Sequence, residues 1–217
     1  MILVEAAVET LESALAGERA GADRIELCIN LNEGGTTPST GLTAAVVDGT
    51  HLPVFVLIRP RAGDFVYADD EIDLMSRDIE TAGIIGVAGI VTGALNSDYS
   101  VDVELTRSLV KAAAGMPVTF HRAFDAITSK SDALEQLIDL GVTRVLTSGG
   151  ATTATEGADV IAALVDQARD RITIIAGGGI REHNVSDVIA RTRVREVHTR
   201  FVGEARMRNL IDAVRKK

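Results

Sequence analysis

The chain has 217 residues, of which 46% are hydrophobic and 24% charged, as expected for one α/β domain or two small ones. The formal net charge of −9 argues against a nucleic-acid or anionic-membrane surface, so we expect neither partner. The single cysteine excludes an internal disulfide and a multi-cysteine metal cage within one chain. Because the N-terminus carries no basic leader and no apolar run approaches the ~18 residues of a membrane span, we expect a cytoplasmic protein.

Short apolar runs rich in β-branched residues alternate with amphipathic segments along the whole chain. Aromatic residues make up only 3%, so Ala, Val, Ile and Leu must build the core, as in a parallel sheet covered by helices. Eight β-then-α units predict a closed (β/α)8 TIM-type barrel, a single domain over residues 1–217. The predicted strands are Ile2–Ala7, Arg24–Cys28, Val54–Arg59, Gly89–Thr92, Val118–Arg122, Arg144–Ser148, Ile172–Ala176 and Glu196–Arg200.

Helical stripes fill several of the gaps between these strands. Residues 207–217 fit either a last helix or a tail. The stripes and their predicted ends are Leu11, Ala14 and Leu15 with a stop at Gly21; Ile72, Met75 and Ile79 with an end at Gly83; Leu134, Leu137 and Ile138 with Ser131 as N-cap and Gly141 as stop; and Val160, Ile161 and Leu164.

Alternation along the strands predicts which side chains enter the barrel. Residues that meet the helix layer must be apolar, so Ile25 and Leu27 point outward and their polar neighbours point inward. Groups that open their strands lie at the bottom, where we expect a structural ion network of Arg24, Arg144 and Glu196. Groups near the C-terminal strand ends should converge on one space, with charged loops above it: Glu26, Cys28, Arg59, His121, Ser148 and His198, then Arg61, Asp64, Arg122 and Asp125.

The run from Val118 to Asp125 ends an apolar strand in a histidine, an arginine and an aspartate. Such an accumulation of charge at a strand end indicates a site, because buried unpaired charge is costly. We interpret Glu26, His121 and Asp125 as candidate catalytic acid–base groups. The alternative for His121 is a structural hydrogen bond, or a metal ligand.

Several groups near the same end of the barrel are suited to an anion. Two arginines flank Pro60, and guanidinium forks match carboxylate or phosphate; the alternative is a closed salt network with Glu5, Glu26 or Asp64. The bare amides of 177–179 follow a strand at the place where such barrels commonly bind phosphate. The residues to which we assign anion or substrate binding are Arg59, Arg61, Arg122, Ser148, Gly177, Gly178, Gly179 and His198.

Two features leave alternatives open. The loop 32–39 is either one wall of the site or only a turn followed by a helix N-cap. Cys28 is either a small buried hydrophobic residue or a metal ligand, and the latter needs His121, His198, a methionine or a second chain as partner.

Six blocks in this chain resemble the copper homeostasis protein CutC family. They are residues 21–28 (GADRIELC), 33–39 (EGGTTPS), 58–65 (IRPRAGDF), 118–125 (VTFHRAFD), 144–149 (RVLTSG) and 177–180 (GGGI). The resemblance runs from about residue 5 to 209 and implies a TIM-type barrel, a cytoplasmic location, a homo-oligomer (a dimer), and a role in copper tolerance with copper(I) binding.

Two departures from the family pattern bear on this role. Some members carry a strand-one cysteine that pairs with the strand-two cysteine, whereas this chain has Ala7 there, and the loop after Arg61 has Ala62 in place of glycine. A two-thiolate copper(I) site within one subunit is therefore not possible. We carry two hypotheses: a copper-handling protein with Cys28 as ligand, and an enzyme of lyase, isomerase or hydrolase type acting on a small anionic or phosphorylated metabolite. A scaffold barrel with a large apolar surface patch is the third.

Overall fold

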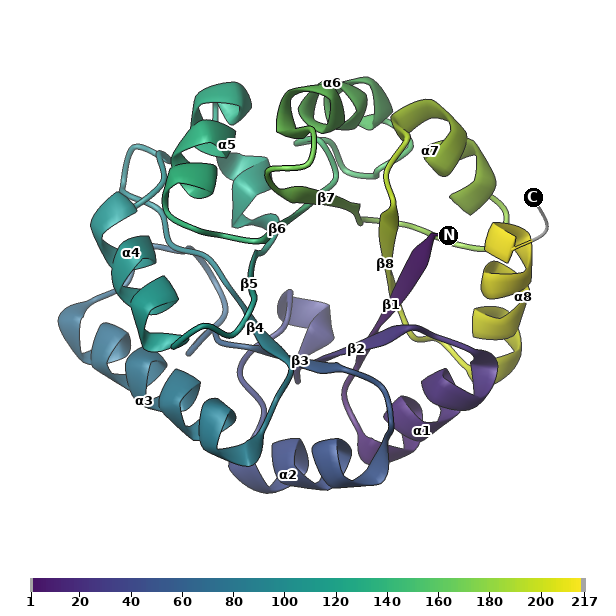
Figure 1. Cartoon of the computed structure of the whole chain (residues 1–217), viewed down its shortest axis with the longest axis horizontal. Coiled ribbons are helices and arrows are strands. Elements are labelled where there is room, and N and C mark those ends of the chain that lie inside the picture. Colours follow the sequence, from purple (N-terminus) through teal and green to yellow (C-terminus); the bar gives the residue numbers. More distant parts are fainter. Residues whose placement is uncertain (1, 216–217) are drawn as a thin grey trace.

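The computed structural model describes residues 2–215 and is a closed barrel of eight parallel strands inside a ring of helices (Figure 1). The predicted (β/α)8 fold is thus confirmed. The strands are β1 (Leu3–Val8), β2 (Arg24–Leu27), β3 (Val54–Leu57), β4 (Gly89–Thr92), β5 (Val118–Phe120), β6 (Arg144–Thr147), β7 (Thr173–Ala176) and β8 (Glu196–Arg200). The helices are α1 (Leu11–Ala20), α2 (Thr40–Gly49), α3 (Asp69–Ile85), α4 (Val103–Ala112), α5 (Lys130–Asp139), α6 (Ala158–Ala168), α7 (Val185–Thr192) and α8 (Glu204–Arg215), with short 3-10 helices η1 (Leu31–Glu33) and η2 (Arg122–Ala126).

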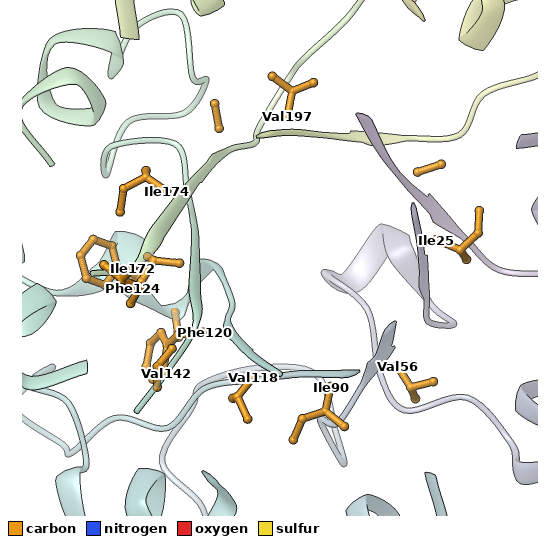
Figure 2. Packing of buried hydrophobic residues seen from close by; sticks show 14 of the residues in the cluster. Ile25, Val56, Ile90, Val118, Phe120, Phe124, Val142, Ile172, Ile174 and Val197 are labelled. Carbon is orange, nitrogen blue, oxygen red and sulfur yellow. The ribbon is translucent and has the colours of Figure 1, made fainter. Parts of the chain in front are cut away.

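The core lies between the strands and the helices. Outward-facing side chains of successive strands, such as Ile25, Ile90, Val118 and Val197, are fully or almost fully buried there (Figure 2). Small and branched residues fill this layer, as the low aromatic content predicts. The inward-facing side chains are therefore free to carry polar chemistry.

Two predicted helix boundaries are wrong. Gly83 lies within α3, where a side chain would approach Met116, and the helix ends instead before Gly86, whose φ of +89° is the left-handed conformation that glycine adopts easily. Ser131 lies inside α5, whose N-cap is Ser129. In both cases a residue of the right type stands within three positions of the true boundary. α8 settles the alternative for 207–217 in favour of a helix, with residues 216–217 outside the described chain.

The bottom of the barrel is closed by the predicted ion network. Arg24 bonds Glu196, and Arg144 lies 3.6 Å from the same carboxylate. The two guanidinium groups lie on the Phe55 ring at 5.0 and 4.9 Å from its centroid. Gly89 makes room for that ring, because a Cβ there would come within 2.3 Å of it. This plug leaves the opposite end as the open mouth.

The chain begins and ends on the same side of the ring, where β1 pairs with β8 and α8 packs on α1 (Figure 1). None of the helices in residues 2–215 is long and apolar enough to cross a membrane.

Candidate functional site

A cavity of about 410 Å³ opens at the C-terminal ends of the strands. This volume suits a small metabolite. Seven of the residues predicted to form the site line it: Glu26, Arg59, His121, Arg122, Gly178, Gly179 and His198. The other lining residues come from the loops and strand ends around the mouth: Leu31, Glu33, Gly34, Leu57, Phe65, Ala123, Leu146, Ile180, Arg181, Thr199 and Arg200.

Strand register creates a buried charge cluster beneath this cavity. Glu5 of β1 pairs with Arg24 of β2 on one side and with His198 of β8 on the other. Its carboxylate accepts a hydrogen bond from Arg24 at 2.5 Å and is hydrogen-bonded to His198 Nδ1 at 2.7 Å. Glu5 is fully buried, so these two partners supply the compensation that its charge requires.

The two partners govern the charge states of the cluster. Burial by itself would raise the pKa of Glu5, but the bonds from His198 and Arg24 outweigh it and lower the pKa to about 2. Burial would likewise lower the pKa of His198, but the carboxylates of Glu26 and Glu5 raise it. Glu5 is therefore ionised, and the protonated form of His198 is favoured.

Glu26 differs from Glu5 in having too few partners. It lies on the inward face of β2, two residues after Arg24, and is paired in register with Ala7 of β1. Its Oε2 is 3.7 Å from His198 Nδ1. That oxygen is buried and has no hydrogen-bond partner among the described residues. Burial, aided by the charge of Glu5, raises the pKa of Glu26 to about 7 against the lowering effects of His198 and Arg24. A carboxyl group that exchanges its proton near neutral pH thus faces the cavity.

Ligand atoms of Glu5, Glu26 and His198 all lie within 4.8 Å of one another, a spacing that a metal ion could bridge. The hydrogen bonds argue against this use. Arg24 occupies one oxygen of Glu5, and His198 Nδ1 occupies the other. A cation would have to break these bonds beside a buried guanidinium, so the donor set fits a proton-sharing cluster better than a metal centre.

His121 follows β5, and only one of its two ring nitrogens has a hydrogen-bond partner among the described residues. Its Nδ1 accepts a hydrogen bond from the Ala123 amide at 3.2 Å, and its Nε2 is buried with no partner among the described residues. Burial, with the nearby charge of Arg59, lowers the pKa of His121 to about 3, so the ring is neutral. Gly93 makes room for it, since a Cβ there would lie 2.6 Å from Nδ1.

Arg59 joins the loops that follow β2 and β3. Its buried guanidinium donates to the carbonyl oxygens of Glu33 (3.1 Å), Gly35 (2.8 Å) and Gly63 (2.8 Å), and lies 5.0 Å from the centroid of the Phe65 ring. Loop 32–39 is more than a turn before a helix, since Glu33 and Gly34 line the cavity while Ser39 caps α2. Arg59 forms no salt bridge with a carboxylate of the described residues, so the salt-network alternative does not apply to it.

Arg61 lies outside the cavity lining. Its guanidinium bonds Glu71 at 2.6 Å and Asp64 at 3.0 Å, and donates to the Val66 carbonyl at 2.8 Å. The closed salt network that we considered for Arg61 is what the structure contains, with Glu71 as an additional member. These partners use its donors on the outside of the mouth.

Asp125 and Ser148 also lie outside the cavity lining, in a network that joins two loops. Asp125 accepts hydrogen bonds from the Thr147 hydroxyl at 2.5 Å, from the Ser148 amide at 2.9 Å and from the Gly150 amide at 3.0 Å. Arg122 completes the network with bonds to Asp125 (2.7 Å) and Ser148 (2.8 Å). Both carboxylate oxygens of Asp125 are thus engaged within the protein.

The loop after β7 supplies backbone donors to the mouth. Gly178 and Gly179 have φ values of +98° and +71°, and their amides donate to no backbone carbonyl among residues 2–215. A Cβ on Gly178 would lie 3.5 Å from the Arg122 guanidinium, so the loop and this arginine are neighbours. Gly177 lies behind them and donates to Thr147.

Cys28 follows β2, does not line the cavity and has an apolar setting. It is fully buried among Phe55, Leu57 and Val91, and its thiol approaches only the Val8 carbonyl, at 3.8 Å. Burial, with the nearby charge of Glu26, raises the pKa of the thiol, so the thiolate that binds metals is disfavoured.

Sequence analysis missed three contributors to this region. Glu5 was considered only as a partner for arginine, although the alternation along β1 places it inside the barrel. Arg181 and Arg200 line the cavity at the ends of β7 and β8, where Arg181 bonds Thr199 and Arg200 bonds Asn32. Arg200 is the last residue of β8 and Arg181 lies in the loop between β7 and α7, and these positions at the mouth of the barrel were the available signal.

Comparison with known proteins identifies the family of this chain. The family model for the CutC family matches residues 2–203. The chain belongs to the CutC family. It is 48% identical over 196 residues to the human copper homeostasis protein cutC homolog, which covers 90% of this chain and 72% of the human protein.

Solved structures are also similar to this CutC-family chain. The crystal structure of a copper homeostasis protein CutC from Streptococcus agalactiae has a TM-score of 0.88 and 38% identity, covering 91% of this chain and 98% of that one. A phosphoribosyl anthranilate isomerase from Thermotoga maritima has a TM-score of 0.68 at 16% identity over the whole of both chains, a likeness of fold alone.

Proposed function

We propose that this CutC-family protein is an enzyme that acts on a small anionic, phosphorylated metabolite in the cavity at the barrel mouth. The observation that carries the proposal is Glu26 Oε2, a buried carboxylate oxygen that has no hydrogen-bond partner in residues 2–215 and belongs to a side chain lining a cavity with arginines on its wall. A protein that binds no ligand there gains nothing from an unsatisfied buried group, which costs about 1–3 kcal/mol. Functional sites are where such costs are retained.

The anionic group of the ligand would lie against the loop after β7. The free amides of Gly178 and Gly179 stand beside the Arg122 guanidinium, and Arg181 and Arg200 line the same cavity. Backbone amides and guanidinium groups together favour phosphate or carboxylate. Local positive charge thus selects an anion in a chain whose net charge is −9.

Glu26 and His198 are the acid–base pair that we assign to the reaction. Glu26 exchanges a proton near neutral pH, and His198 is held in its protonated form by Glu5 and Glu26. Asp125 and Ser148 serve to position Arg122 and the two loops, because their hydrogen-bonding groups are engaged with each other. Arg59 serves to position loop 32–39.

Thermal unfolding with added anions tests this proposal. We expect phosphate or sugar phosphates to raise the melting temperature, and Arg200→Met to weaken the binding about 10-fold or more through loss of a charged donor. Arg107→Met is the matched control, since Arg107 is exposed on α4 and pairs only at 4.0 Å with Glu104. No stabilisation by any of these anions would refute the proposal.

Copper handling is the second candidate, because the human and streptococcal relatives bear the name copper homeostasis protein. The donor set around Cys28 does not fit copper(I), which prefers soft ligands. The thiol has apolar neighbours and a raised pKa. Titration with copper(I) against a competing chelator tests this candidate: equal affinities for the parent and Cys28→Ala would exclude Cys28 as a ligand.

The dimer and the cytoplasmic location implied by the family resemblance stay predictions. Size-exclusion chromatography with light scattering measures the first, and fractionation of cells that express the tagged protein measures the second.

A further inference from the structure

His121 is locked in one tautomer by its backbone contact. An amide N–H can only donate, so Nδ1, which accepts from Ala123 at 3.2 Å, carries the lone pair. In the neutral ring the proton must then be on Nε2, the atom that is buried without a partner on the cavity wall. His121 therefore offers one N–H donor to whatever occupies the cavity.

This locked state excludes two roles for His121. Its pKa of about 3 prevents it from acting as a base near neutral pH. Metal binding through Nε2 would require a proton on Nδ1, which would then oppose the Ala123 amide. The remaining role is to donate a hydrogen bond to a ligand oxygen.

Glu26 supplies the complementary group from another part of the cavity lining. It comes from β2, whereas His121 follows β5, so β3 and β4 separate them around the ring. Glu26 Oε2 is thus a buried acceptor and His121 Nε2 a buried donor, each without a hydrogen-bond partner among the described residues, and both residues line a space that a small ligand can fill. A ligand that satisfies both atoms must offer a hydrogen to Glu26 and an acceptor oxygen to His121.

We propose that the cavity enolises a small phosphorylated carbonyl compound, with Glu26 taking the proton next to the carbonyl and His121 binding the carbonyl oxygen. This rests on the proposed function and adds a reaction class to it. The C–H electron pair becomes the C=C bond, and the carbonyl π pair moves to the oxygen, which accepts the Nε2–H hydrogen bond. The hydroxyl proton on the deprotonated carbon then passes to this oxygen, the oxygen that lost it forms the new C=O bond, and the C=C electron pair takes the proton back from Glu26 at the former carbonyl carbon. Isomerisation of a 2-hydroxy carbonyl compound therefore needs no oxidant, reductant or co-reactant.

A neutral imidazole suits this task better than an imidazolium. It stabilises negative charge as it develops on oxygen without giving its proton away in the ground state, and the burial of Nε2 strengthens that bond. The Phe65 ring packs on His121 at 4.9 Å between centroids, which fixes the direction of the donor. Pre-orientation of this kind is what transition-state stabilisation requires.

Hydrogen–deuterium exchange tests the proposal directly. The protein is incubated in D2O with dihydroxyacetone phosphate, ribulose 5-phosphate or fructose 6-phosphate, and proton NMR follows the loss of signal next to the carbonyl. Melting shifts with the same probes report binding separately. We expect exchange above the buffer rate for a probe that raises the melting temperature, with a loss of about 100-fold or more in Glu26→Gln.

The variants have matched controls on the surface. His121→Phe should lose about 100-fold or more in exchange rate, whereas His51→Phe should lose none, since the His51 side chain is 96% exposed. Glu104→Gln, at an 88% exposed side chain, is the control for Glu26→Gln. Nitrogen-15 NMR should show Nε2 of His121 protonated and Nδ1 unprotonated from pH 5 to 9.

Each outcome decides a separate point. A probe that binds in the cavity without exchange overturns the enolisation and leaves the anion site in place. If none of the probes binds, the proposed function fails with it. Exchange that persists in Glu26→Gln, or a His121 ring protonated on Nδ1, overturns the assigned roles.

Discussion

Glu26 should make stability depend on pH in a direction opposite to that of most carboxylates. Its pKa rises to about 7 in the fold, so the native state binds its proton more tightly than the unfolded chain does. Such a group contributes its full stabilisation of the native state at pH values below the pKa that it has in the unfolded chain. That contribution is lost as the pH rises through about 7, the pKa of Glu26 in the fold. We expect Glu26→Gln to gain stability relative to the parent between pH 5 and pH 8.

Urea denaturation at several pH values measures this difference. The shift corresponds to about 1.4 kcal/mol for each unit by which the pKa is raised, as an upper limit. Glu104→Gln should show no such trend, since that carboxylate is exposed. A parent and a Glu26→Gln variant that run parallel across this range would contradict a raised pKa.

Sequence alternation located Glu26, His121 and His198 on the cavity wall but could not rank their neighbours. Cys28 obeys the same alternation, yet the loop after β2 covers it, with Gly35 packed so closely that a Cβ would lie 3.6 Å from the cysteine. Asp125 lies in η2 and Ser148 directly follows β6, but their side chains hydrogen-bond each other. Mutual satisfaction of polar groups depends on loop conformations, which strand periodicity does not contain.

At the level of elements, the pairing of β3 with β4 depends on Gly89, which leaves room for the Phe55 ring. We expect Gly89→Ala to destabilise the protein by about 1–3 kcal/mol, because its Cβ would lie 2.3 Å from the Phe55 ring, itself held by Arg24 and Arg144. Chemical denaturation gives the value, and Phe55→Leu in the same chain should restore part of it.

Gly41→Ala is the control for this substitution. Gly41 lies in α2 with no atom within 4 Å of a Cβ, so alanine there should leave stability unchanged or raise it by about 0.5 kcal/mol. Equal effects at both glycines would show that backbone entropy, rather than the Phe55 contact, decides.

Element types were predictable from the sequence, but some boundaries were not. β4 and β8 have the predicted limits, whereas β5 ends at Phe120, two residues early, because His121 turns out of the ladder to cap η2. α3 runs past Gly83, which packs beside Met116, and ends before Gly86. A local pattern cannot distinguish a glycine that ends a helix from one that fits a neighbour.

Across the whole molecule, Arg24 connects the first strand to the last. It bonds Glu5 of β1 and Glu196 of β8 from β2, so three strands at the closure of the ring share one guanidinium. We expect Arg24→Met to cost about 3–5 kcal/mol in the free energy of unfolding, because Glu5 would keep a buried charge without that partner.

The control lies at an exposed ion pair. Arg195→Met breaks a pair with Asp170 in which both side chains are more than four-fifths exposed, so its effect should stay below about 1 kcal/mol. If Arg24→Met unfolds no more easily than Arg195→Met, the buried network does not stabilise the closure.

The closed ring itself was predictable, because eight strand–helix units leave few other arrangements. The bottom network was predictable as well, since Arg24, Arg144 and Glu196 all open their strands. The inclusion of Glu5 was not foreseen, because its place depends on a register that brings β8 beside β1. A closed barrel makes β1 and β8 neighbours, but the register between them, on which the contact of Glu5 with His198 depends, is not contained in a local pattern.

The bonds of Arg59 to the carbonyls of Glu33, Gly35 and Gly63 have a consequence for how a ligand would arrive. Two rim segments pinned by one buried cation cannot swing as a lid, so this side of the entrance keeps the same outline whether the cavity is empty or full. Ligand should then enter at a rate set by diffusion through that opening, and crystals grown without it should admit it by soaking without cracking.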